Sequence, residues 1–301
     1  MPRDVPRKTP RLIGALTALF LTLAGLPARA ADADAQARGA YLASAAGCDG
    51  CHTDAEHRGR PYAGGRGFGT PFGTVFAPNI TPDQLTGIGR WGLADFTRAL
   101  RWGIAPDDSH YLPIFPFLFY NRLRDDDLED LKAFLQTVPA VTRVNPPGNT
   151  SILTTARTRA AITIAAERMP GPRQSDPMKG AVWNRGAYLV TTVGRCGDCH
   201  TPRNWLGALK FERALSGTSV GPGGKAVPNI TPDRETGIGK WSEDEIISLL
   251  KDGQTPDFDF VGGAMAEIVK NTSRLDDTDR RAIAVYLRSM PAIRSQQRGA
   301  H

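Results

Sequence analysis

The chain carries Cys-Asp-Gly-Cys-His at residues 48–52 and Cys-Gly-Asp-Cys-His at residues 196–200. These two pentapeptides contain all four cysteines and two of the five histidines of the 301 residues. In a C-x-x-C-H segment the two thiols bond covalently to a haem, and the adjacent histidine becomes the proximal ligand of its iron. The sequence therefore predicts two haem c groups, held by Cys48, Cys51 and His52 at the first site and by Cys196, Cys199 and His200 at the second.

The same C-x-x-C spacing also occurs in zinc sites and in dithiol redox pairs. A four-cysteine zinc site would need both pairs to meet in the fold, whereas His52 and His200 lie 148 residues apart and each pair opens its own long segment. A disulfide within either pair could exist only before haem attachment, since the thioether bonds use both sulfurs. Haem attachment is the favoured interpretation.

The N-terminal 30 residues have the three regions of a secretory signal peptide. A basic region with four Lys or Arg residues precedes an apolar run from Leu12 to Leu26, and Ala28-Arg29-Ala30 forms an A-x-A cleavage site. An uncleaved anchor is the alternative, but this run of 15 residues is shorter than the about 20 that span a bilayer. We expect cleavage near Ala31 and a mature chain in the bacterial periplasm, soluble or at the membrane surface.

Net charge excludes one class of partner. The chain has 37 Lys and Arg against 31 Asp and Glu, and without residues 1–30 the balance is 32 against 30. So small an excess gives no reason to expect a nucleic acid partner. The mature length is sufficient for two domains of ordinary size.

An internal repeat indicates how the chain is divided. The segment Arg-Gly-Ala-Tyr-Leu precedes each haem site, at residues 38–42 and 185–189. The block Pro-Asn-Ile-Thr-Pro-Asp at residues 78–83, followed by Thr-Gly-Ile-Gly and a tryptophan, recurs 150 residues later. We therefore expect two copies of one module, at residues 31–140 and 182–301, joined by a linker at residues 141–181.

Helical periodicity dominates both copies, so the expected fold is mainly α. Each copy should consist of a few helices around its haem, as in a cytochrome c type domain, with little sheet. Proline-rich segments bracket an alanine-rich run in the linker, which we expect to form one connecting helix. The expected helices are Ala35–Ala46, Leu93–Trp102, Asp125–Thr137, Ile152–Arg168, Val182–Val193, Glu243–Lys251 and Asp277–Ser289.

Several of these motifs together support a family resemblance. The segment Arg-Gly-Ala-Tyr-Leu, Cys-His-Thr-Pro-Arg-Asn ending at Asn204, the two Asn-Ile-Thr-Pro-Asp blocks and Gly-Gly-Ala-Met at 262–265 resemble those of bacterial dihaem and multihaem cytochromes c. The chain is similar to the cytochrome subunits of membrane-bound alcohol and gluconate dehydrogenases. Those subunits typically carry three haems, whereas this chain has two C-x-x-C-H sites. The resemblance implies electron transfer from a periplasmic dehydrogenase towards a terminal oxidase or another cytochrome, and it does not identify the dehydrogenase.

The second haem has a candidate distal ligand in Met265, which lies 65 residues after His200. A thioether there would give a His/Met iron, and the glycines at 262 and 263 would let a loop approach the porphyrin. The alternative is a core methionine that fills a gap beside aromatic rings.

The first haem lacks this ligand, because the repeat places Phe115 where the second copy has Met265. His110, five residues earlier, is the candidate for a bis-histidine iron, although it could also be an exposed loop residue. Met169 or Met178 from the linker could instead supply the ligand, or the iron could be open or bound by water. His57 lies too close to His52 along the chain to reach the opposite face of the haem.

Unequal ligands imply unequal reduction potentials, so we expect electrons to enter at the first haem and to leave at the second. We expect the tryptophans and asparagines of the repeated blocks, Trp91, Trp241, Asn79 and Asn229, to pack against or hydrogen-bond the haem edges. Arg203 and Asn204 could contact a propionate, bridge the domains or lie on the surface. The second function to test is a peroxidase-like dihaem enzyme with an open iron at the first site.

Overall fold

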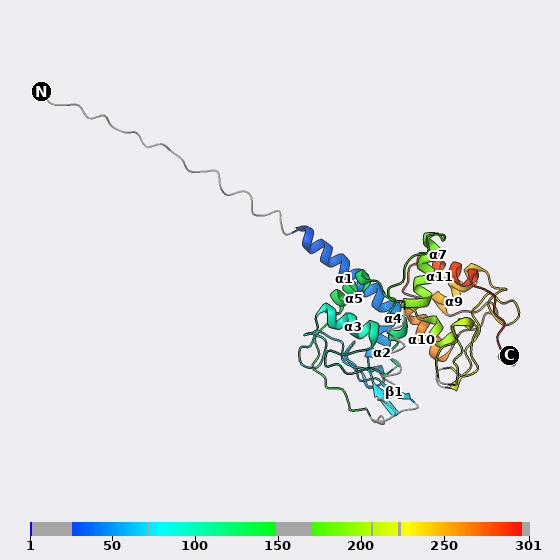
Figure 1. Cartoon of the computed structure of the whole chain (residues 1–301), viewed down its shortest axis with the longest axis horizontal. Coiled ribbons are helices and arrows are strands. Elements are labelled where there is room, and N and C mark those ends of the chain that lie inside the picture. Colours follow the sequence, from blue (N-terminus) through cyan, green and yellow to red (C-terminus); the bar gives the residue numbers. More distant parts are fainter. Residues whose placement is uncertain are drawn as a thin grey trace.

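The computed structural model describes residues 1, 26–70, 73–112, 114–148, 170–205, 207–221 and 224–296. We refer to residues 26–148 as the first half and to residues 170–296 as the second half. The first half begins with a long helix that leads into the first C-x-x-C-H segment (Figure 1). Its elements are α1 (Leu26–Ala46), α2 (Cys48–His52), η1 (Ala55–His57), β1 (Gly67–Thr70), β2 (Gly73–Phe76), α3 (Leu93–Trp102), α4 (Phe117–Tyr120) and α5 (Asp125–Leu135).

The second half, like the first, is mainly helical. The one sheet of the described residues lies in the first half, where strands β1 and β2 pair antiparallel from Gly67 opposite Phe76 to Thr70 opposite Gly73. The prediction of a helix-rich fold with little sheet is therefore confirmed. The elements of the second half are α7 (Ala181–Tyr188), the π-helical turn η2 (Leu189–Val193), α8 (Cys196–His200), η3 (Phe211–Arg213), α9 (Glu243–Asp252), α10 (Gly263–Thr272) and α11 (Asp277–Ser289).

The expected helices agree with these bounds to within a few residues, except at the N-terminus and in Val182–Val193. There the α-helix α7 ends at Tyr188 and continues as the π-helical turn η2 to Val193. The bounds of α3 and α11 are confirmed at both ends, α9 ends one residue later, and α5 ends at Leu135 instead of Thr137. Helix α1 begins at Leu26 instead of Ala35 and so runs through the A-x-A segment. The expected linker helix Ile152–Arg168 and residues 2–25 of the expected signal peptide lie outside the described residues. No helix in the described ranges combines the length and the apolar character needed to cross a membrane.

The glycine of each Arg-Gly-Ala-Tyr-Leu segment allows two helices to cross at very short distance. A Cβ at Gly39 in α1 would lie 1.9 Å from the carbonyl oxygen of Asp130 in α5. A Cβ at Gly186 in α7 would lie 1.9 Å from the carbonyl oxygen of Ala282 in α11. Both halves therefore pack the helix before the C-x-x-C-H segment directly against their last helix.

Asn79 and Asn229, which were expected to pack against or hydrogen-bond the haem edges, are hydrogen-bonded within the chain. The Asn79 amide donates to Thr86 Oγ1 at 3.0 Å and to the Val141 carbonyl at 2.7 Å, and its oxygen accepts from both the amide and the hydroxyl of Thr81. Asn229 makes the same four bonds with its own half, ending on the carbonyl of Ile293. Because these bonds use all the hydrogen-bonding capacity of each amide, the two side chains fix the segment that follows the last helix and have no group left to hydrogen-bond a haem. Their packing against a haem edge stays a prediction.

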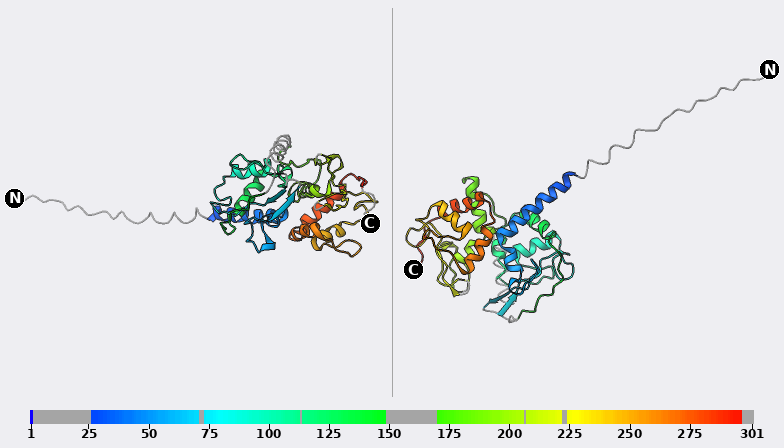
Figure 2. Two further views of the ribbon diagram at one scale, coloured as in Figure 1. Left: turned by 90° about the horizontal axis from the view of Figure 1, so that it is seen from below. Right: turned by 180° about the vertical axis from the view of Figure 1, so that it is seen from behind.

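The two halves lie side by side (Figures 1 and 2). They meet through a reciprocal pair of hydrogen bonds. Tyr41 of α1 donates to Asp279 Oδ2 in α11 at 2.7 Å, and Tyr188 of α7 donates to Asp127 Oδ2 in α5. Both tyrosines are the fourth residue of the repeated Arg-Gly-Ala-Tyr-Leu segment. Buried apolar residues of both halves form one continuous cluster around this junction.

Candidate functional site

The first C-x-x-C-H segment forms the one-turn helix α2, which begins after Gly47 in a left-handed conformation. The imidazole of His52 lies with Nδ1 2.7 Å from the carbonyl oxygen of Pro78. Since a carbonyl can only accept, Nδ1 carries the proton and Nε2 keeps its lone pair for a metal. Burial lowers the pKa of His52, which favours this neutral form.

The second segment repeats this geometry in α8. Nδ1 of His200 lies 2.8 Å from the carbonyl oxygen of Pro228, and burial again lowers the pKa of the imidazole. Pro78 and Pro228 are the first residues of the repeated Pro-Asn-Ile-Thr-Pro-Asp blocks. The repeat therefore supplies the partner that orients each histidine.

The four cysteines are free and partly buried. Burial raises the pKa of Cys48 to about 12 and that of Cys196 to about 11, so both are neutral thiols. Among the described residues no group of three or more His, Cys, Asp and Glu side chains gathers as a metal site. Two thiols on one helical turn, next to an imidazole with a fixed tautomer, fit the requirements of a haem c site.

Met265 lies in the first turn of α10, not in a loop as the glycine pattern suggested. The helix begins at Gly263, whose φ of +57° shows that the glycine makes the turn into the helix. The Met265 side chain is partly buried. Its role as a distal ligand stays a prediction.

His110 lies in a hairpin that has the same backbone bonds in both halves, and Phe115 follows it. Tyr111 N donates to Gly103 O at 2.7 Å, and Val261 N donates to Gly253 O at 2.9 Å. The offset of 150 residues is therefore kept up to residue 111, four residues before Phe115. The Phe115 ring packs edge-on against Tyr111 and Tyr120, with centroids 5.5 and 5.9 Å apart.

The remaining candidates near the first site differ in their surroundings. His110 is partly buried and pairs with Ile104 across the hairpin, and its role as a ligand stays a prediction. The imidazole of His57 is 79% exposed and lies 2.9 Å from Asp54 Oδ1. Met178 is 88% exposed, and Met169 lies outside the described residues.

Arg203 and Asn204 make local contacts. Arg203 donates to the carboxylate of Asp198 at 2.6 Å and to the carbonyl of Gly207 at 3.0 Å. Asn204 Oδ1 accepts from the amide of Ala208 at 3.0 Å. Of the three roles expected for these residues, surface placement agrees with this geometry, since 43% of the Arg203 side chain is exposed.

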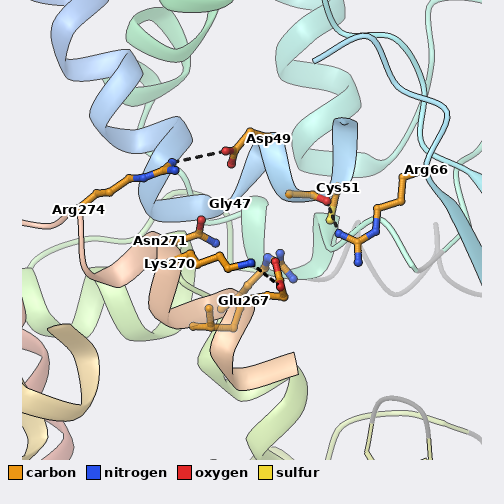
Figure 3. A pocket seen from close by; sticks show the side chains of 11 residues that line it. Gly47, Asp49, Cys51, Arg66, Glu267, Lys270, Asn271 and Arg274 are labelled. Atoms are coloured by element: carbon orange, nitrogen blue, oxygen red, sulfur yellow. Dashed lines mark hydrogen bonds and ion pairs between the residues drawn. The ribbon is translucent and has the colours of Figure 1, made fainter. Parts of the chain in front are cut away.

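A pocket beside Cys51 lies where the two halves meet (Figure 3). Asp49 of α2 pairs with Arg274 across the junction at 3.4 Å, and Lys270 pairs with Glu267 within α10 at 2.8 Å. Arg195, which directly precedes the second site, also lines this pocket. The environments of the two C-x-x-C-H segments are therefore in contact.

Comparison with known proteins decides the family. The chain is 41% identical over 262 residues to a dihaem c-type cytochrome of Cereibacter sphaeroides, a match that covers 85% of this chain and 86% of that relative. This chain belongs to the c-type cytochromes. The resemblance expected from the motifs is confirmed, and membership of this family implies covalently bound haem.

Further relatives of this cytochrome are subunits of dehydrogenases. It is 39% identical to the fructose dehydrogenase cytochrome subunit of Gluconobacter japonicus, and 37% identical to the cytochrome c subunit of a quinone-dependent alcohol dehydrogenase of Gluconobacter oxydans. The matches cover 85% and 94% of this chain but only 52% and 60% of those relatives. No model of a known protein family matches the chain.

Tyr41, Tyr188 and Arg195 were not predicted from the sequence. The tyrosines stood in the repeated segment, but nothing in that segment indicated that each one bonds to the other half. Alignment of the two copies could have pointed to Arg195, because the first copy has Gly47 at the equivalent position.

Proposed function

We propose that this protein is a periplasmic dihaem cytochrome that carries electrons from a dehydrogenase towards a terminal oxidase or another cytochrome. The observation that carries the proposal is that two C-x-x-C-H turns each hold a buried imidazole with Nδ1 on a proline carbonyl. The chain would comprise two modules, at residues 31–140 and 182–301, joined by residues 141–181. The recurrence of the same glycine crossing and the same asparagine bonds in both halves supports this division.

The chain's own residues would attach, orient and tune the haems. The paired cysteines would form the thioether bonds, and His52 and His200 would present Nε2 to the iron. When bound, each haem supplies an iron that alternates between the ferric and ferrous states. The bonds to Pro78 and Pro228 fix each ring and increase its basicity, which favours the ferric state.

Different distal ligands would give the two haems different potentials. We assign Met265 as the distal ligand at the second site and His110 as the ligand at the first. A His/Met iron has a higher potential than a bis-histidine iron. Electrons would therefore enter at the first haem and leave from the second.

The donor is proposed from the relatives. Cytochrome subunits of fructose and alcohol dehydrogenases share most of this chain's length, which supports a dehydrogenase as electron donor. The chain spans only 52–60% of these two subunits, so the similarity does not identify the substrate of the donor dehydrogenase. Attachment to a partner at the membrane surface would not require a membrane-spanning helix.

The number of haems tests this function most directly. A pyridine haemochrome assay of the purified protein should give two haem c per chain. The double variants Cys48→Ala/Cys51→Ala and Cys196→Ala/Cys199→Ala should each keep one haem that survives denaturation. A count other than two in the wild type would refute the dihaem proposal.

The ligand assignments need a separate spectroscopic test. Met265→Ala should remove the methionine-to-iron charge-transfer band of the oxidised protein, and His110→Ala should make the first haem high-spin. Retention of the band in Met265→Ala would exclude this methionine. Met178→Ala is the control, because an exposed methionine should leave every band unchanged.

The proposed location has its own test. After expression in a bacterium with cytochrome c maturation, N-terminal sequencing of the periplasmic fraction should begin near Ala31. A haem-loaded protein that starts at Met1 would show that the signal segment is retained.

A peroxidase-like enzyme is the second candidate function, and Phe115 is the observation that favours it. A phenyl ring cannot bind iron, and Phe115 stands in a ring cluster with Tyr111 and Tyr120. If the first iron is open, the wild-type protein should bind cyanide and reduce peroxide. A low-spin first haem that does not bind cyanide would exclude this function.

A further inference from the structure

Arg195 occupies a backbone position that favours glycine. It directly precedes α8, with φ +43° and ψ +41°, and its counterpart before α2 is Gly47, with φ +69° and ψ +37°. The left-handed conformation is easy for glycine and strained for a residue with a Cβ. Strain of this kind beside a cofactor site indicates that the side chain has a role there.

The Arg195 side chain crosses from the second half to the first. Its Nε lies 3.3 Å from the hydroxyl of Tyr120, a buried residue of α4. The same hydroxyl donates to the carbonyl of Ala46 at 3.5 Å, two residues before Cys48. One chain of contacts therefore connects Arg195, directly before the second haem site, to Ala46, two residues before the first.

The charge of the guanidinium is incompletely neutralised. Only 20% of the Arg195 side chain is exposed, and its nearest carboxylate, Asp198, is 3.8 Å away and also pairs with Arg203 at 2.6 Å. The other acidic groups of the shared pocket have partners, since Asp49 pairs with Arg274 and Glu267 with Lys270. A partly buried charge of this kind acts on its neighbours more strongly than a charge in water.

The field of Arg195 reaches both haem sites. Arg195 directly precedes Cys196, and its side chain lines the same pocket as Cys51 of the first site. The cysteine sulfurs become thioethers when haem attaches, so they no longer titrate. In the holoprotein the charge of Arg195 would act as a positive potential at the edge of each haem that carries the thioethers. A positive potential favours the ferrous state, which has one positive charge fewer.

We propose that Arg195 is a positioning residue that raises the reduction potentials of both haems and holds their attachment sites together through Tyr120. The inference rests on the proposed dihaem function. It adds to that function a residue that belongs neither to a C-x-x-C-H motif nor to a repeated segment. At this strained position the first copy has glycine and the second copy has arginine. Through this arginine the second half acts on the first.

The test is a spectroelectrochemical titration of the two-haem protein and its Arg195→Met, Arg195→Gly and Arg195→Lys variants. Arg195→Met and Arg195→Gly should lower both midpoint potentials, with at least a tenfold change in the reduction equilibrium, or about 59 mV for one electron. Arg195→Lys, which keeps the charge, should recover most of the shift. Arg195→Gly also removes the backbone strain, so it should fold even if Arg195→Met does not.

Two further variants separate a tuning role from a structural one. Tyr120→Phe removes the hydroxyl contact but not the charge, so it should shift the potentials less than Arg195→Met. Arg203→Met removes an exposed arginine that also pairs with Asp198 and should shift them least. Unchanged potentials in a two-haem Arg195→Met protein would overturn the proposal for Arg195, whereas a haem count other than two would overturn the dihaem function itself.

Discussion

The two halves hold their histidines in the same way but surround the attachment sites differently. His52 and His200 have equivalent proline partners at 2.7 and 2.8 Å. Around this common frame, the first half has Gly47 and Phe115 where the second has Arg195 and Met265. The repeat thus preserves what orients the proximal ligand, while the differences fall on residues that would set the potential of each iron.

Exchanging the residues at the distal position should have the largest effect. Met265→Phe should abolish the methionine-to-iron band, because phenylalanine cannot bind iron. Phe115→Met, made together with His110→Ala to remove the competing imidazole, should create such a band at the first site. Absorption and electron paramagnetic resonance spectra of the oxidised variants measure both changes. If Phe115→Met adds no band, residues 115 and 265 are not equivalent in space despite the offset of 150 residues.

Adding a methyl group at the helix crossings should have the next largest effect. Gly39→Ala and Gly186→Ala should each lower the free energy of unfolding by about 3 kcal/mol, since backbone atoms cannot yield as a flexible side chain does. Gly180→Ala is the matched control, because no atom lies within 4 Å of a Cβ built there. Chemical denaturation of the holoprotein measures the loss. Equal stability of all three variants would show that the two crossings can open to admit a methyl group.

The reciprocal bonds at the junction are unequal, and this difference gives a third prediction. Asp279 accepts two bonds from Arg185, at 2.8 and 2.6 Å, as well as the bond from Tyr41. Asp127 accepts from Tyr188 and, at 3.2 Å, from Arg124. Asp279→Asn should therefore cost about 3 kcal/mol and Asp127→Asn about 2 kcal/mol. The reverse order, measured by chemical denaturation, would contradict the predicted ranking.

The same carboxylate predicts an acid dependence. Burial opposes ionisation of Asp279, but the bonds from Arg185 and Tyr41 outweigh it and keep the pKa of this carboxyl below its ordinary value. A lowered pKa in the folded state gives stability that is present above about pH 4 and is lost as the pH falls through the folded value. Asp279→Asn should show a smaller loss of stability over this range than the wild type. Parallel curves for the two proteins would show that Asp279 does not contribute to acid unfolding.

What could be predicted from the sequence was local or repeated. The helix Asp277–Ser289 has acids in its first turn and one apolar face, so its bounds follow from short-range chemistry. The proximal histidines follow from a motif of five residues. The junction could not be predicted, because Tyr41 and Asp279 lie 238 residues apart and neither carries a pattern that identifies its partner. The start of α1 at Leu26 was missed because an A-x-A segment indicates cleavage and also suits a helix.

The smallest predicted effect concerns the N-caps of α9 and α3. Ser242 accepts from the amide of Glu245 at 3.2 Å, and Glu245 accepts in return from the amide of Ser242 at 2.7 Å. In the first half Asp95 accepts from the amide of Gly92 at 2.9 Å, but Gly92 has no side chain to complete the exchange.

Ser242→Ala should therefore lower the free energy of unfolding by about 1 kcal/mol, while Gly92→Ser should raise it by a few tenths, roughly 0.3 kcal/mol. Denaturation midpoints of the holoprotein variants measure both changes. The opposite signs matter more than the sizes, because they test whether each half tolerates the residue of the other at an equivalent position. A loss of stability in Gly92→Ser would mean that the first half requires glycine there for a reason other than capping.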